Sequence, residues 1–131
     1  MIGSTFAMRQ AIRKAAATGI GFAGLCNSCH FGAAGCYATL AADEGMIGIA
    51  MCNDTPTVTV PGALGPVLGS NPIAYAVPAG EQLVLLDIAT STVAGGKVFA
   101  AAALGKSIPE GWLDDEQGRP ATDPSTFPAK A

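Results

Sequence analysis

The stretch Cys26-Asn27-Ser28-Cys29-His30-Phe31-Gly32 decides how this chain is organised. It carries the only histidine of the 131 residues, and histidine is the side chain whose ordinary pKa falls in the physiological range. An apolar run over residues 20–25 precedes the stretch, and a helix-like run over residues 33–42 follows it. A polar tip between a strand and a helix is where a scaffold commonly displays reactive groups. From the residues alone, His30 is either a reactive group displayed at this turn or a histidine whose hydrogen bonds are satisfied in the core.

Hydrophobic periodicity, interrupted by glycine and proline, divides the rest of the chain into short elements. We expect a first helix over residues 4–17, with Phe6 and Ile12 on its buried face. The elements predicted after it are a buried strand over 20–26, a helix over 33–44 stopped by Gly45, a buried strand over 46–52, a hairpin with strands over 73–77 and 82–86, and a helix over 93–104 capped by Thr90 or Ser91. An irregular loop is expected over 53–69, and turns with a loose end beyond Gly105.

The composition is unusually apolar. Charged residues make up 13% of the chain and hydrophobic residues 50%, against roughly 25% charged residues in an average soluble domain. Mean hydropathy is +0.39. Polar residues and prolines interrupt the long uncharged stretches, so neither fits a membrane-spanning helix. A net charge of −3 without a basic cluster argues against nucleic acid as a partner. We expect the chain to be part of a larger polypeptide, an oligomer subunit, or both.

The four cysteines allow more than one interpretation. Residues 1–10 lack a signal-peptide pattern, so a cytoplasmic protein with reduced thiols is expected, and Cys26, Cys36 and Cys52 are then small buried hydrophobic residues. Two chemical alternatives remain at this point. Cys26-x-x-Cys29-His30 matches the attachment pattern of a c-type haem, which would make the chain an electron carrier. Cys26, Cys29, His30 and Cys36 could instead hold zinc.

A series of motifs along nearly the whole chain resembles the type-2 malate/L-lactate dehydrogenase family. Residues 27–35 (NSCHFGAAG) look like that family's Asn-Ser-x-His-Phe-Gly-x-Ala-Gly signature. The further similar blocks, in order, are Ala41-Ala42 with Gly45-Met46-Ile47-Gly48, Leu68-Gly69-Ser70-Asn71-Pro72-Ile73-Ala74, Asp87-Ile88-Ala89-Thr90-Ser91 with Gly96-Lys97, Ile108-Pro109-Glu110-Gly111-Trp112 and Thr122-Asp123-Pro124. The family also includes L-sulfolactate and ureidoglycolate dehydrogenases and diketogulonate and cyclic-imine reductases. One block alone would be a weak signal, whereas an ordered series is specific.

The resemblance implies an NAD(P)-dependent oxidoreductase that interconverts a small 2-hydroxy acid, such as malate or lactate, and its 2-oxo acid. His30 would be the acid/base, because oxidising an alcohol releases a proton that an imidazole can accept. Residues 87–90 would lie along the dinucleotide, where backbone N–H groups at a helix start suit phosphate. The implied contacts to NAD or NADP are His30, Asp54, Asp87, Ile88, Ala89, Thr90 and Lys97, and those to the substrate are His30 and Asn53. No metal is implied.

The resemblance also implies an α+β fold in which a mixed, largely antiparallel sheet flanked by helices binds the dinucleotide without a Rossmann fold. The sequence agrees, since no Gly-x-Gly-x-x-Gly follows a predicted strand. Residues 1–131 would be a single partial NAD(P)-binding and catalytic domain, because the family's N- and C-terminal parts have no counterpart here. The parent enzyme is expected to be a homodimer, with no nucleic-acid or membrane partner. The chain alone is expected to be inactive or poorly folded.

Three residues depart from the family's usual pattern. A polar residue such as Asn is commoner where Cys29 stands, and Tyr or a larger group is commoner where Cys36 stands. Many members have a neutral Ser or Thr near Asp54, so this chain places a negative charge close to the expected cofactor. Cys29, adjacent to the implied acid/base, is expected to make the enzyme sensitive to thiol reagents.

Overall fold

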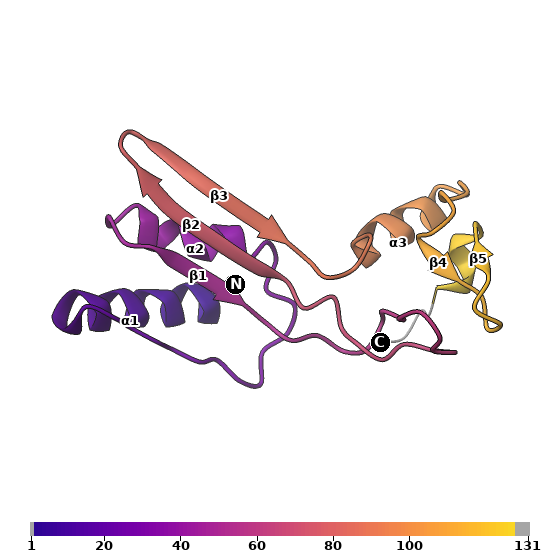
Figure 1. The fold of residues 1–131 in the computed structure, drawn as a ribbon, viewed down its shortest axis with the longest axis horizontal. Helices are drawn as coiled ribbons and strands as arrows, with labels where there is room; N and C mark the ends of the chain where they lie inside the picture. Colours follow the sequence, from indigo (N-terminus) through magenta and orange to yellow (C-terminus); the bar gives the residue numbers. More distant parts are fainter. Residues whose placement is uncertain (1, 128–131) are drawn as a thin grey trace. The chain divides into compact units, whose positions relative to one another are not determined.

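A computed structural model describes residues 2–127 (Figure 1). They form two compact units, of which the first is the chain up to Cys52 together with Pro72–Ile88. The second unit is Asn53–Asn71 together with the chain from Ala89 onward. Helices and small antiparallel sheets build both units, which confirms the predicted α+β class. Whether the two units act as the one domain expected from the sequence stays a prediction. None of the helices described is both long enough and apolar enough to cross a membrane.

The first unit is a three-stranded antiparallel sheet covered on one face by a helix (Figure 1). Its strands, β1 (Gly48–Met51), β2 (Ile73–Ala79) and β3 (Gln82–Ile88), lie in the order β1-β2-β3, and helix α2 (Gly35–Ala42) packs on them. The core consists mainly of small side chains, with Ala38, Ala74 and Ala76 fully buried. A Cβ atom at Gly48 would lie 2.0 Å from the Ala38 carbonyl oxygen. Small residues therefore let the helix approach the sheet closely.

Local signals explain where these elements end. Gly45 has a φ of 74°, and its N–H donates to the Ala42 carbonyl while the Met46 N–H donates to the Ala41 carbonyl. This is the pattern of a glycine-terminated helix, and it confirms the predicted stop of α2 at Gly45. The hairpin between β2 and β3 is also confirmed, with Gly80 at a positive φ in its two-residue turn.

The N-terminal helix α1 (Ile2–Thr18) is confirmed, but its predicted buried face is wrong. No residue of α1 is buried, and Phe6 is 62% exposed. Met8 packs against the alanine-rich core, and α1 contacts α2 over part of its length. The apolar face that the sequence predicts for α1 is therefore larger than the apolar surface on which it packs among the described residues.

The strand predicted over residues 20–26 is not formed. The segment is extended but unpaired, and Ile20 and Phe22 are each more than 80% exposed. It runs close to α1, since a Cβ atom at Gly21 would lie 1.9 Å from the Ala11 carbonyl oxygen. A strand requires a neighbour for its backbone hydrogen bonds, and none of the described strands pairs with this segment. The apolar run alone therefore did not determine its structure.

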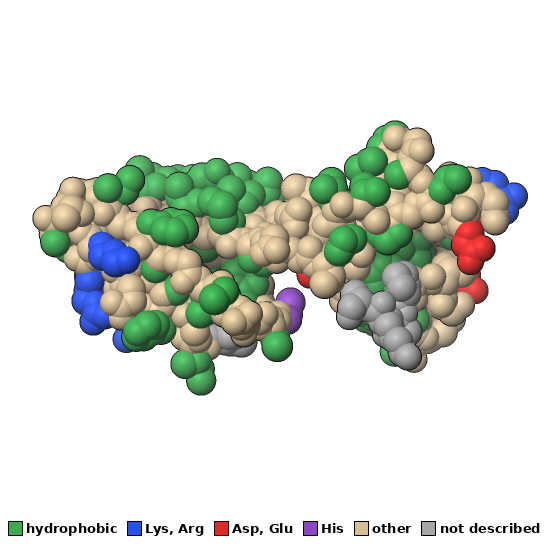
Figure 2. Space-filling model, turned by 90° about the horizontal axis from the view of Figure 1, so that it is seen from below, with side chains coloured by type: hydrophobic (Ala, Val, Ile, Leu, Met, Phe, Trp, Pro, Cys, Tyr) green, Lys and Arg blue, Asp and Glu red, His purple; other side chains and the backbone are tan. Residues whose placement is uncertain are grey.

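The strand predicted as buried over residues 46–52 is half-buried instead. In β1, Gly48 and Ala50 face the core while Ile49 and Met51 are exposed. The exposed face continues across the sheet, because Ile49 pairs with Tyr75 and Tyr75 pairs with Leu86. The large exposed apolar residues on this face are Ile49, Met51, Tyr75, Val84, Leu86 and Ile88. Figure 2 shows hydrophobic side chains gathered on the surface of this unit.

This apolar sheet face predicts a measurable property of the 131-residue chain, because contiguous apolar patches associate with one another and bind hydrophobic dyes. The double substitution Ile49→Lys and Leu86→Lys is expected to reduce dye fluorescence severalfold and to reduce self-association in sedimentation velocity. Both side chains are nearly half exposed, so the melting temperature should change little. Ala76→Lys, at a fully buried position, is the control that should unfold the chain. Unchanged dye binding by the double variant would contradict the prediction.

The second unit contains helix α3 (Gly95–Ala103), the short strands β4 (Leu113–Asp114) and β5 (Pro120–Ala121), and the 3-10 turn η1 (Pro124–Thr126). Its core is small, and the Phe99 and Phe127 rings meet edge to face with centroids 5.1 Å apart. The predicted irregular loop over 53–69 is largely confirmed, although Val58 and Leu68 form an isolated antiparallel bridge. Part of the loose end expected at the C-terminus lies outside the described residues.

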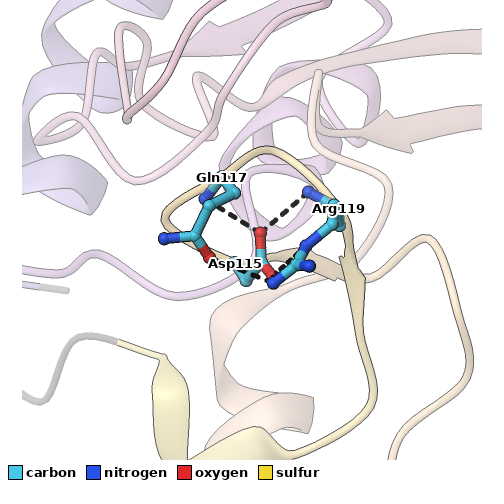
Figure 3. Close-up of polar contacts among 3 residues, drawn as sticks. All are labelled: Asp115, Gln117 and Arg119. Carbon is cyan, nitrogen blue, oxygen red and sulfur yellow. Dashed lines mark hydrogen bonds and ion pairs between the residues drawn. The ribbon is translucent and has the colours of Figure 1, made fainter.

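The β4–β5 hairpin is closed by a carboxylate network (Figure 3). Asp115 accepts hydrogen bonds from the N–H groups of Gln117 and Arg119, both at 2.9 Å, and pairs with the Arg119 guanidinium at 2.7 Å. The Arg119 backbone N–H, followed by its guanidinium, lowers the pKa of Asp115 below its ordinary value. Stability from this network is therefore present at neutral pH and is lost as the pH falls through that lowered pKa.

Candidate active site

His30 lies in an irregular turn on the surface of the first unit. Two residues with positive φ bound this turn, Asn27 at 54° and Gly32 at 83°. Asparagine and glycine tolerate that conformation better than other residues. The imidazole is exposed and is visible at the surface in Figure 2. His30 is therefore exposed at the surface and is not a buried core residue.

The residue after His30 is held by helix α2. The Phe31 and Tyr37 rings stack, with centroids 5.3 Å apart and an interplanar angle of 16°. The Tyr37 hydroxyl donates a hydrogen bond to the Phe31 carbonyl oxygen. Tyr37 is 5% exposed and belongs to the buried core, and Phe31 packs against that core. The backbone beside His30 is thus anchored although the imidazole itself is exposed.

Asp87 supplies the hydrogen bond that the start of α2 otherwise lacks. Ala34, the N-cap residue, has no side chain that can accept from the first turn. The buried Gly35 N–H instead donates to Asp87 Oδ2 at 2.8 Å, over a sequence separation of 52 residues. A Cβ atom on residue 35 would lie 2.8 Å from the same oxygen. Asp87 therefore joins the end of β3 to the helix that follows the His30 turn.

In the second unit, Asp54 lies at the centre of a network that connects separate segments. Its Oδ2 accepts from the Ser70 hydroxyl at 2.8 Å, and its N–H donates to Asn71 Oδ1 at 3.0 Å. The Thr55 N–H donates a hydrogen bond to Asp54 Oδ1 at 2.8 Å. The Thr90 N–H and hydroxyl both donate to the Ser70 carbonyl, at 2.9 and 3.0 Å. Asp54 and Thr90 are thus both hydrogen-bonded to Ser70.

The predicted site residues divide between the two units. His30, Asp87 and Ile88 belong to the first unit, whereas Asn53, Asp54, Ala89, Thr90 and Lys97 belong to the second. Asn53, Ala89 and Lys97 are exposed, and Lys97 lies in the first turn of α3. Within the first unit, Asp87 contacts the helix that follows His30. Within the second unit, Asp54 and Thr90 both hydrogen-bond to Ser70.

Two predictions about this region are wrong. Neither Thr90 nor Ser91 caps α3, since its N-cap residue is Ala94 and no side chain accepts from its first turn. The cysteines predicted to be buried, Cys26 and Cys36, are exposed, as is Cys29, and Cys52 is half-buried. Within residues 2–127 no group of three or more histidine, cysteine or acidic side chains is placed to hold a metal ion.

Three residues gain importance only from the structure. Gly35 and Tyr37 support the His30 turn. Gly35 belongs to the signature motif, but the motif alone does not show what this glycine does. Ser91 Oγ is buried and has no hydrogen-bond partner among the described residues. A buried hydroxyl without a partner, directly after Thr90, is a group that an oxygen-rich ligand could satisfy. The uncapped start of α3 offers further N–H donors in this unit.

Comparison with known sequences gives a match along the whole chain. A family model described as malate/L-lactate dehydrogenase matches residues 1–131. A malate/(S)-sulfolactate dehydrogenase of Methanothermus fervidus is 47% identical over 118 residues, which are 90% of this chain and 35% of that protein. A malate dehydrogenase of Pyrococcus horikoshii is 49% identical over 115 residues, 88% of this chain and 32% of that protein. The chain thus spans about a third of the length of these curated relatives.

Two other relatives are named with their cofactors. An NAD(+) ureidoglycolate dehydrogenase of Escherichia coli O157:H7 is 36% identical over 124 residues, 94% of this chain and 36% of that protein. An NADP(+) (2R)-3-sulfolactate dehydrogenase of Chromohalobacter salexigens is 39% identical over 118 residues, 89% of this chain and 35% of that protein. Nothing in these comparisons supports the c-type haem alternative.

Solved structures give the same result for the fold. A crystal structure of malate dehydrogenase from Entamoeba histolytica superposes with a TM-score of 0.88 at 36% identity. The similarity covers 95% of this chain and 35% of that one. A sulfolactate dehydrogenase from Methanocaldococcus jannaschii superposes with a TM-score of 0.77 at 40% identity, covering 95% of this chain and 36% of that one.

Proposed function

Because this chain belongs to the malate/L-lactate dehydrogenase family, we propose that the complete gene product containing it is an NAD(P)-dependent 2-hydroxy-acid dehydrogenase. It interconverts a small 2-hydroxy acid, of the malate or lactate type, and its 2-oxo acid. The observation that carries the proposal is the family match over the whole chain, which includes the exposed His30 turn. The relatives named malate, sulfolactate and ureidoglycolate dehydrogenases support the substrate class.

His30 is the proposed acid/base. In the oxidation direction, an imidazole nitrogen accepts the proton of the substrate hydroxyl as the carbon loses a hydride, and in the reduction direction it returns that proton. Exposure of the imidazole makes it accessible to substrate, and the Phe31–Tyr37 contact fixes the backbone beside it. Asn53 is the second proposed substrate contact. It is exposed and lies two positions after the end of β1.

The proposed cofactor contacts are His30, Asp54, Asp87, Ile88, Ala89, Thr90 and Lys97. NAD or NADP supplies the hydride acceptor when bound. The unpartnered Ser91 hydroxyl and the uncapped start of α3 supply polar groups that fit ribose or phosphate oxygens. Relatives named for NAD(+) and for NADP(+) support a nicotinamide cofactor of either kind. Binding would occur on the antiparallel sheet and its helices, without a Rossmann fold, in a cytoplasmic homodimer.

A substrate panel tests this function directly. The complete gene product is mixed with NAD or NADP and, in separate assays, with malate, lactate, sulfolactate or ureidoglycolate. The formation of reduced cofactor is followed by its absorbance. We expect turnover of at least one acid, and the reverse reaction with the corresponding 2-oxo acid. The absence of turnover with every acid and both cofactors, together with no fluorescence change of NADH or NADPH on mixing, would contradict the proposal.

Cys29 leads to a separate prediction, because it is exposed and directly precedes the proposed acid/base. Alkylation of its thiol places a bulky group beside His30, so the enzyme should lose most of its activity on treatment with a maleimide. Bound NADH or NADPH should slow that loss. Cys29→Ser should remain active under the same treatment, while Cys36→Ser, which removes another exposed thiol, should be inactivated like the wild type. Inactivation of the Cys29→Ser enzyme at the wild-type rate would contradict the prediction.

A further inference from the structure

The position of Asp87 connects two regions that the proposed function uses. Asp87 pairs with Ala74 near the end of β3 and is the first residue of the proposed dinucleotide-binding segment, residues 87–90. Its carboxylate accepts a hydrogen bond from the Gly35 N–H at 2.8 Å. Gly35 is the first residue of α2 and lies five positions after His30. One carboxylate therefore belongs to the proposed cofactor segment and also contacts the helix that anchors the acid/base turn.

This contact is favourable because of what the start of α2 lacks. The first N–H groups of a helix have no partner within the helix, and Ala34 supplies no side-chain acceptor. The Gly35 N–H is buried, so leaving it without an acceptor would be costly. A negatively charged acceptor at this end also interacts favourably with the helix dipole. Glycine at position 35 is required for the approach, because an added Cβ would lie 3.3 Å from the Asp87 Cβ and 2.8 Å from its Oδ2.

The anchored helix in turn fixes the backbone beside His30. Tyr37, on the first turns of α2, donates its hydroxyl to the Phe31 carbonyl and stacks on the Phe31 ring. Displacement of the start of α2 would therefore move Phe31, and with it the adjacent His30. The chain of contacts runs from Asp87 through Gly35 and Tyr37 to Phe31, all within the first unit.

We infer that Asp87 is a positioning residue, which holds the start of α2 through the Gly35 N–H and thereby sets the place of the His30 turn within the first unit. This inference rests on the proposed function and deepens it. It assigns to Asp87 a task carried out through its hydrogen bond to the protein, in addition to any contact that the residue makes with the cofactor. Its consequence is that removing the acceptor should affect the rate of the chemical step more than cofactor affinity.

The test compares Asp87→Ala with Asp87→Asn in the complete gene product, at a temperature well below the melting transition. Asp87→Ala is expected to lower kcat by about 10- to 100-fold, since a displacement of about 1 Å in a catalytic group can cost a factor of that size. Asparagine keeps an oxygen that can accept from the Gly35 N–H, so Asp87→Asn should lose clearly less of its kcat than Asp87→Ala does. The dissociation constant of NADH or NADPH, from fluorescence titration, should change by a similar factor in both variants, because both replace the carboxylate that the proposed cofactor contact uses. The difference in kcat between them then reports on the Gly35 contact.

Gly35→Ala approaches the same contact from its other side. The added methyl group displaces the Asp87 carboxylate, so kcat should fall as it does in Asp87→Ala. The double variant Gly35→Ala/Asp87→Ala should be little worse than either single variant, because both remove one interaction. Asp43→Ala, which removes an exposed carboxylate at the other end of α2, is the control that should leave kcat unchanged.

Three outcomes would overturn the inference. The first is a kcat of the Asp87→Ala enzyme equal to that of the wild type. The second is a loss of cofactor affinity in both Asp87→Ala and Asp87→Asn while kcat at saturating cofactor is unchanged. The third is that the effects of Gly35→Ala and Asp87→Ala on kcat add in the double variant. A melting temperature lowered in Asp87→Ala with kcat of the folded enzyme intact would show a merely structural role. Failure of the proposed function is distinguishable, because it would appear as absent turnover in the wild type.

Discussion

Replacing His30 by alanine in the complete gene product is expected to lower kcat for hydroxy-acid oxidation by about 10²- to 10⁴-fold, the usual contribution of a positioned acid/base. His30 is the single histidine of the 131 residues. The residue is exposed, so its removal leaves no cavity, and the melting temperature should stay close to that of the wild type. The measurement is steady-state turnover at saturating cofactor, with circular dichroism as the check on folding.

Cofactor affinity separates the catalytic effect from a binding defect. The His30→Ala enzyme should still change the fluorescence of NADH or NADPH, because most of the proposed contacts to the dinucleotide come from residues 87–90. Cys29→Ser, one position earlier in the same turn, is the matched control and should keep its turnover. A His30→Ala enzyme with turnover equal to the wild type on its best substrate would refute the proposed role.

The second large effect is expected from Gly48→Ala, which should lower the free energy of unfolding by about 1–3 kcal/mol or more, the range for overpacked cores. The added Cβ would lie 2.0 Å from the Ala38 carbonyl oxygen and 3.0 Å from the Ala38 Cα. These are backbone atoms of α2, so the clash cannot be relieved by rotating a side chain. The helix must move away from β1, and the contacts of the buried alanines on both sides are lost.

Urea unfolding followed by far-UV circular dichroism measures this effect. Gly24→Ala is the control within the same unit, because its Cβ would lie 3.8 Å from the Phe22 ring, an ordinary contact. We expect Gly24→Ala to unfold near the wild-type urea concentration and Gly48→Ala well below it. An insoluble Gly48→Ala protein beside a soluble Gly24→Ala protein would agree with the prediction. Equal unfolding midpoints for the two variants would show that α2 does not pack on β1 as closely as described.

The parts of the fold that could be predicted are those determined by neighbours in the chain. Gly45 stops α2 because a left-handed glycine and two hydrogen bonds within six residues form that stop. The β2–β3 hairpin depends on a two-residue turn at Gly80 and on adjacent strands. The motif over residues 27–35 likewise lies in a single short stretch, and the family that it indicates is confirmed by the family match. Such features require no knowledge of where the rest of the chain lies.

The residues whose prediction failed are those whose environment comes from distant segments. Residues 20–26 have the composition of a buried strand, yet no described strand pairs with them, and Phe22 is 82% exposed. Cys26 and Cys36 were expected to be buried because cysteine commonly is, and both are exposed. In β1, the alternation of Ala50 and Ile49 placed the smaller residue inside, because α2 approaches too closely for a larger one.

The family, the helices and the hairpin could be predicted from the amino-acid sequence, since each depends on residue types within a few positions of one another. The structure was needed to show that Asp87 accepts from the Gly35 N–H across 52 residues, that Asp54 and Thr90 both bond to Ser70, and that one face of the sheet is apolar and exposed. These features depend on how distant segments pack, because that packing sets the partners of each side chain. Composition and spacing describe which partners a residue can accept, whereas the fold selects the one it meets.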